Sequence, residues 1–127
     1  MQLKHYQQLI AWQKAIALVT EIYSATRSFP RDEIYGLTSQ IRRAAVSVPS
    51  NIAEGQGRAT RGEFLQFLGH ARGSLCELET QTVIAANLHY LTDDQSDALS
   101  SSITEVGRIL SGLIASLERK TAAVTSH

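Results

Sequence analysis

Residues 35–79 read YGLTSQIRRAAVSVPSNIAEGQGRATRGEFLQFLGHARGSLCELE, and this stretch decides the fold. Apolar residues recur at spacings of three and four on both sides of a break at Gly55 and Gly57. Such spacing places one apolar stripe on each of two helices, and the glycines are expected to end the first helix. Thr60 followed by Glu63 has the form of a capping box that starts the second helix, and Thr92 followed by Gln95 has the same form before residue 93. The stretch therefore predicts a helical hairpin.

The same apolar spacing occurs before and after this hairpin, and strict alternation of apolar and polar residues is nowhere sustained, so strands are not expected. The pattern predicts helices over about 8–28, 36–57, 61–88 and 93–120, with a frayed polar tail over 121–127. Connections of a few residues between helices of this length favour antiparallel neighbours. We therefore expect the whole chain to form one all-α domain, an antiparallel up-down-up-down four-helix bundle.

Four apolar stripes are expected to form the core of this bundle. They comprise Leu9, Trp12, Ile16, Val19 and Tyr23; Leu37, Ile41, Ala44, Val48 and Ile52; Phe64, Leu68, Ala71, Leu75, Leu78, Thr82 and Ala85; and Leu99, Ile103, Val106, Leu110, Leu113 and Leu117. The first helix carries further apolar residues outside its stripe, namely Ile10, Ala15, Leu18 and Ile22. An apolar face wider than one bundle seam marks a partner surface. We therefore expect a homo-oligomer.

Pro49 lies inside the second helical pattern. Proline lacks the backbone N–H and clashes with the preceding turn, so we expect the helix to bend or loosen around Ala45. Ser47, Ser50 and Asn51 could satisfy the freed backbone groups. The bend serves either to wrap this helix around its neighbours or to form a binding feature.

Composition excludes several classes of protein. Hydrophobic residues make up 43% and charged residues 19% of the 127 residues, which is too apolar for a disordered chain. Twelve basic and twelve acidic residues give no overall attraction to nucleic acid or membrane. The single cysteine, Cys76, cannot form an internal disulfide, and we expect it to be a small buried side chain. Neither a signal peptide nor a membrane span is evident, so a cytoplasmic location is expected.

The residues that could carry catalysis do not form a recognisable set. A dimetal bundle needs Glu-x-x-His pairs, but His5, His70 and His89 are preceded at that spacing by other residues. His70 and Ser74 share one helix face, yet no third group completes a nucleophilic site. We therefore expect no enzymatic activity, no metal site and no cofactor.

A polar stripe runs beside the apolar stripe of the second helix. It comprises Gln40, Arg43, Ser47, Asn51 and Glu54, with Ser74 and Glu77 facing it from the third helix. Pairing the two helices about the turn places Arg43 level with Ser74 and Gln40 level with Glu77. We therefore expect a partly buried Arg43–Glu77 contact within a network that sets helix register or subunit contacts. The alternative is a solvated face.

The segments QIRRAAVSVPSNIAEG (40–55), EFLQFL (63–68) and GSLCELE (73–79) resemble the S23, or 23S rRNA-intervening-sequence, family of four-helix bundle proteins. LIAWQKAIALVTEIY (9–23) and NLHYL (87–91) extend the resemblance, whereas the fourth helix matches only in pattern. The family name describes where some member genes lie. Members are similar to accessory proteins of diversity-generating retroelements, which are strongly basic pentameric rings that bind nucleic acid. The resemblance therefore implies a pentamer.

Together these observations predict a non-enzymatic, homo-oligomeric assembly or adaptor protein. The alternative is an accessory protein that binds RNA or DNA weakly and without sequence preference, directly or beside a nucleic-acid-processing protein. Its contact would be the basic end of the bundle, where no aromatic platform is expected beside the arginines. That end comprises Lys4, Arg58, Arg61, Arg119 and Lys120, with Glu54, Glu63 and Glu118. The opposite, acidic end comprises Asp32, Glu33, Asp93, Asp94 and Asp97, with Arg27 and Arg31.

Overall fold

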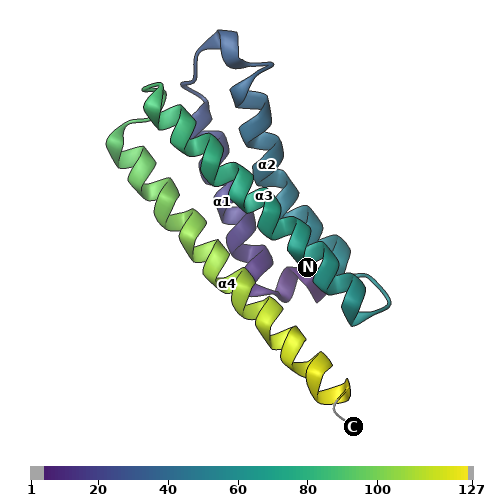
Figure 1. Ribbon diagram of the computed structural model, residues 1–127. Coiled ribbons are helices and arrows are strands. Elements are labelled where there is room, and N and C mark those ends of the chain that lie inside the picture. Colours follow the sequence, from purple (N-terminus) through teal and green to yellow (C-terminus); the bar gives the residue numbers. More distant parts are fainter. Residues whose placement is uncertain (1–4, 126–127) are drawn as a thin grey trace.

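The computed structural model describes residues 5–125, with side chains described from 5 to 120. Its long helices are α1 (Ile10–Thr26), α2 (Leu37–Gln56), α3 (Arg61–Asn87) and α4 (Asp93–Thr125). The short 3-10 helices η1 (His5–Gln8) and η2 (Arg31–Glu33) precede α1 and α2. The long helices run alternately up and down (Figure 1). Both α1 and α3 pack against α2 and α4 but not against each other, which confirms the predicted four-helix bundle.

The helix bounds agree with the sequence to within about two residues, apart from the end of α4. We expected a frayed tail from residue 121, but α4 continues to Thr125, and residues 126–127 lie outside the described part. Among the described residues, no helix has the length and apolar character that crossing a bilayer requires.

The core stripes of α2, α3 and α4 are largely those predicted. The buried members are Ile41, Ala44, Val48, Ile52, Leu68, Ala71, Leu75, Leu78, Thr82, Ala85, Leu99, Ile103, Val106 and Leu110. Near the end of α4 the buried side shifts to Ile114, whereas Leu113 and Leu117 are half-buried. This shift follows from the 3.6-residue turn, which carries a long heptad-like stripe gradually around the helix.

The predicted core face of α1 is wrong. Its buried residues are Ala11, Ala15, Leu18, Ile22 and Ala25, whereas Ile16 and Tyr23 are exposed and Leu9, Trp12 and Val19 are half-buried. Both stripes have the same spacing, so periodicity could not distinguish them. The difference lies in side-chain size, because the alanines let α1 approach its neighbours closely and leave the bulkier stripe outside. The surplus apolar face is therefore present, but other residues form it.

α2 is helical from Leu37 to Gln56, and Pro49 is buried inside it. Pro49 has no N–H to donate to the carbonyl of Ala45. Ser50 Oγ donates to the carbonyl of Val46 at 2.8 Å, and Asn51 Nδ2 donates to that of Ser47 at 2.8 Å. The polar residues near the proline therefore bond to the carbonyls next to Ala45, and not to the carbonyl that loses its partner.

The turn between α2 and α3 depends on a capping box and on close helix packing. The backbone N–H of Glu63 donates to Thr60 Oγ1 at 3.1 Å, as predicted. Gly57 caps α2, but Gly55 lies inside the last turn and is buried, so its predicted role as a helix end is wrong. A Cβ at Gly55 would lie 2.7 Å from the Cβ of Phe67. Position 55 therefore requires glycine because α3 crosses α2 there at close range.

At the opposite end, Glu33 joins the start of α2 to the α3–α4 connection. Its Oε1 accepts from the N–H of Leu37 at 3.2 Å, and its Oε2 accepts from the hydroxyl of Tyr90 at 3.0 Å. This hydrogen bond, with smaller contributions from desolvation and from nearby carboxylates, raises the pKa of Tyr90 above its ordinary value of 10.0. The contact holds the two connections of this end together.

The start of α4 carries the second predicted capping box. The N–H of Gln95 donates to Thr92 Oγ1 at 3.1 Å, and Gln95 Oε1 accepts from the N–H of Thr92 at 2.9 Å. Just before it, His89 has a φ of 64°, in the left-handed region that ends α3. Two consecutive caps therefore separate α3 from α4.

Candidate functional site

A polar groove lies between α2 and α3, where the sequence predicts a polar network. It has a volume of about 410 Å³, and its lining residues are Gln40, Arg43, Ala44, Ser47, Ser74 and Glu77. The hydroxyls of Ser47 and Ser74 lie 2.8 Å apart, and Asn51 Nδ2 donates to Ser47 Oγ at 2.9 Å. Ser47, and not Arg43, is therefore level with Ser74, one helical turn from the predicted pairing.

The predicted, partly buried Arg43–Glu77 pair does not form. Both side chains are exposed at the edge of the groove, and the ion pairs of the described residues lie elsewhere. Glu77 Oε1 instead accepts from Gln81 Nε2 at 3.2 Å. An exposed ion pair gains little, because water screens the charges and two long side chains must be held still.

The remaining network residues divide into two groups. Asn51 and Ser74 are joined through Ser47, as part of a half-buried network between the helices. Gln40 is exposed beside the groove, and Glu54 lies outside it, where its Oε1 accepts from Arg58 at 2.8 Å. The groove thus contributes a hydrogen-bonded register contact between α2 and α3, with charged groups only at its edge.

Sequence reasoning missed Gln81, which is 6% exposed and has an Oε1 without a hydrogen-bond partner. The available signal was its place in the third stripe, three residues after Leu78 and four before Ala85. A glutamine at a core position is uncommon and extends the polar network of α3 inwards.

The predicted basic end is only partly available for binding. Arg58 is paired with Glu54, and its guanidinium carbon lies 4.6 Å from the centre of the Phe67 ring. The expectation that no aromatic ring lies beside these arginines is therefore wrong. Arg61, Arg119 and Lys120 are exposed, and Lys4 lies outside the described residues. The α2–α3 turn and the end of α4 lie at the same end of the bundle (Figure 1).

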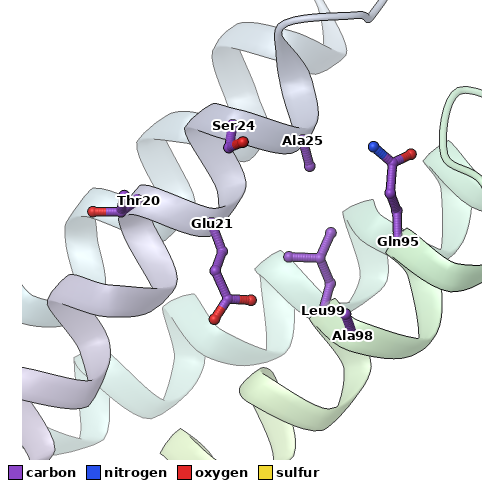
Figure 2. Close-up of a pocket in the computed structure, with 7 residues that line it drawn as sticks. All are labelled: Thr20, Glu21, Ser24, Ala25, Gln95, Ala98 and Leu99. Carbon is purple, nitrogen blue, oxygen red and sulfur yellow. The ribbon is translucent and has the colours of Figure 1, made fainter.

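A second groove, of about 390 Å³, lies between α1 and α4. It is lined by Thr20, Glu21, Ser24 and Ala25 of α1 and by Gln95, Ala98 and Leu99 of α4 (Figure 2). Both carboxylate oxygens of Glu21 accept from Ser102 Oγ at 2.9 Å. The one carboxylate that lines this groove, that of Glu21, is therefore already hydrogen-bonded from α1 to α4. This hydrogen bond joins the two helices along the groove.

The reactive side chains do not assemble. Ser74 bonds to Ser47, and the ring of His70 packs edge-on against Phe67 with 5.9 Å between centroids. Cys76 was predicted to be buried but is exposed, because it comes one residue after the buried Leu75 and lies on the outer side of α3. Within the described part of the chain, no three His, Cys, Asp or Glu residues gather closely enough to hold a metal ion.

These features define a small all-α protein whose distinctive residues lie along the α2–α3 hairpin. The sequence model of the 23S rRNA-intervening sequence protein family matches residues 7–112, and the chain belongs to that family. The resemblance seen in the hairpin residues is thereby confirmed.

Solved structures share this fold, and one of them matches most of this chain. It is the crystal structure of a protein with unknown function from the S23 ribosomal protein family of Bacteroides thetaiotaomicron VPI-5482. The two chains are 20% identical, with a TM-score of 0.77 over 84% of this chain and 96% of that one. At this identity the similarity establishes the fold alone. No curated protein matches the sequence.

Proposed function

We propose that this protein is a homo-oligomeric assembly module, a ring of five subunits that presents its bundle surface to partners and has no enzymatic activity. The observation that carries the proposal is a pair of apolar surfaces on different helices of the bundle. The family resemblance supplies the number five.

The first surface, the α1–α2 patch, is the apolar stripe of α1 that the core leaves outside, together with the adjoining face of α2. Its residues line a shallow groove of about 260 Å³ and include Trp12, Ile16, Val19, Val46 and Ala53. Ile16 is 38% exposed and Val46 39% exposed. Contiguous apolar exposure of this kind marks an interaction site on a soluble domain.

The second surface, the α3 patch, comprises Val83, Ile84 and Leu88, which are 55%, 43% and 48% exposed. The two patches belong to different helices, and α3 does not contact α1. A ring of more than two subunits needs this arrangement, because each subunit joins its neighbours through two different surfaces. A twofold dimer would need only one self-complementary patch.

The chemistry of the described residues supports a role without catalysis. Ser74 is engaged by Ser47, and His70 packs on Phe67, so neither activates the other. The polar groove holds two helices in register and orients no reactive group.

Light scattering coupled to size-exclusion chromatography tests the ring. We expect the parent to have the mass of five subunits, and Ile16→Glu and Ile84→Glu each to block one patch and dissociate the ring. Mixing the two variants should yield a dimer, since each retains the patch that the other lacks. Ser111→Glu adds the same charge at an exposed position of α4 and should leave the mass unchanged. A monomeric parent, or variants that assemble like the parent, would refute the proposal.

Nucleic-acid binding is the second candidate, and the exposure of Arg61, Arg119 and Lys120 at one end of the bundle favours it. Binding would rest on phosphate contacts and counterion release, so it should be weak, sensitive to salt and indifferent to sequence. A ring would place several such ends on one strand. Fluorescence anisotropy with a structured RNA at low salt should show binding that the double variant Arg58→Glu, Arg61→Glu loses.

The matched control for that assay is Arg72→Glu, Arg108→Glu, which makes the same charge change at exposed positions elsewhere. Equal loss in both double variants would mean that net charge alone governs the binding. Absence of binding by the parent at low salt would remove the candidate.

A further inference from the structure

A cavity of about 250 Å³ lies at the corner between the end of α1, the connection containing η2 and the start of α2. Three arginines line it, namely Arg27, Arg31 and Arg42, and no acidic residue does. This corner belongs to the end that the sequence predicts to be acidic. The structure therefore gathers three positive charges in a concave site where the charge pattern predicts the opposite.

Arg42 is held in place by the residues around it. Its Nε donates to Thr26 Oγ1 at 2.8 Å, and its guanidinium carbon lies 4.6 Å from the centre of the Tyr23 ring. The Thr26 hydroxyl in turn donates to the carbonyl of Ile22 at 2.7 Å. The terminal nitrogens of Arg42 have no bond to any other described residue, so a fixed guanidinium presents free donors beside the cavity.

Arg27 and Arg31 are exposed at the opening, and neither belongs to an ion pair of the described residues. Two acidic residues, Asp32 and Glu33, follow Arg31 in the sequence. The carboxylate oxygens of Glu33 accept hydrogen bonds from the N–H of Leu37 and the hydroxyl of Tyr90. Asp32 is exposed and does not line the cavity. The guanidinium groups at the opening are therefore available to an anion.

Thr38 supplies an independent observation. It lines the cavity, is only 6% exposed, and its Oγ1 is buried without a hydrogen-bond partner. A buried hydroxyl without a partner is costly, and folded proteins rarely keep one without a reason. Thr38 also lies in the first turn of the 20-residue helix α2, next to Leu37, whose N–H is bonded to the Glu33 carboxylate.

We propose that this cavity binds a phosphate group, either free or carried by a small molecule. Arginine guanidinium groups match the geometry of phosphate oxygens, and a bound oxygen would accept from the unpaired Thr38 hydroxyl. The cavity is smaller than most ligand pockets, so it holds the phosphate and leaves the rest of the carrier at the opening. Phe29 lines the same cavity and provides apolar contact for that part.

Isothermal titration calorimetry at constant ionic strength tests the proposal with three probes: inorganic phosphate, glycerol 3-phosphate and adenosine 5′-monophosphate. Saturable binding of at least one probe is expected. Equal affinities for all three identify free phosphate as sufficient, whereas tighter binding of either ester identifies a carried phosphate. Both results support the proposal. No binding of any probe at millimolar concentration would overturn it.

Variants locate the site. Arg27→Gln with Arg31→Gln should weaken binding by at least about tenfold, since two charge-assisted hydrogen bonds are lost. Arg72→Gln, an exposed arginine of α3, should not change it. Thr38→Val should also weaken binding, yet raise the melting temperature of the free protein, because it removes the unpaired hydroxyl. If Arg27→Gln with Arg31→Gln did not change binding, the assignment would be overturned. It would also be overturned if these arginines bound structured RNA but the protein bound none of the three probes.

Discussion

Replacing Gly55 with alanine should destabilise the bundle by about 1–2 kcal/mol, although alanine is the better helix former. The added Cβ would lie 2.7 Å from Phe67 Cβ, 3.0 Å from Phe64 Cδ1 and 3.3 Å from the Phe64 carbonyl oxygen. The nearest atom is a Cβ on a packed helix, so α3 itself must move. Overpacking costs about 1–3 kcal/mol, and the gain in helix propensity offsets roughly 0.5–1 kcal/mol of that.

Gly69→Ala is the matched control. Gly69 lies on the exposed side of α3, and a Cβ there would meet nothing within 4 Å. This change should stabilise the protein by about 0.5–1 kcal/mol through helix propensity alone. Urea denaturation at one fixed subunit concentration measures both changes, because unfolding of an oligomer depends on concentration. If Gly55→Ala were as stable as Gly69→Ala, close α2–α3 packing would not be the reason for glycine at position 55.

Three further predictions concern individual side chains. Arg43→Ala should change the free energy of unfolding by no more than about 0.5 kcal/mol, because Arg43 is exposed and does not pair with Glu77. A larger loss of stability, measured by urea denaturation, would mean that the predicted Arg43–Glu77 pair does form. The raised pKa of Tyr90 means that its bond to Glu33 stabilises the fold below pH 10 and is lost as pH rises through the folded-state pKa. The stability difference between the parent and Tyr90→Phe should therefore be constant at neutral pH and fall in strong alkali. Cys76 is exposed, so it should react with a thiol reagent in the absence of denaturant. If Cys76 stayed unreactive both in the parent and in Ile16→Glu, in which the ring is expected to dissociate, its exposure would be contradicted.

Much of the fold was readable from short-range pattern. The spacing of Ile41, Val48 and Ile52, and of Leu68, Leu75 and Leu78, predicted which sides of α2 and α3 are buried. Both capping boxes formed as predicted, because a cap depends on residues only three positions apart. These features are local, so each is determined before the helices meet.

The candidate site was less predictable. The sequence placed Asn51 and Ser74 in one polar network, and they are joined through Ser47. It also predicted an Arg43–Glu77 pair that does not form, because an error of one turn in pairing two helices changes every facing residue. The cavity of Arg27, Arg31 and Arg42 was missed, since its residues come from two helices and the connection between them.

The sequence by itself determined that this chain forms four amphipathic helices, where each begins, and the antiparallel order that short connections require. Tertiary structure decided which of two equally spaced stripes of α1 enters the core, which residues of α2 and α3 lie level, and where unpaired arginines gather. The physical reason is that periodicity defines positions around one helix axis. Rotation and approach between helices depend on the summed packing of all side chains at the contact, and small residues such as Ala15 and Gly55 control it.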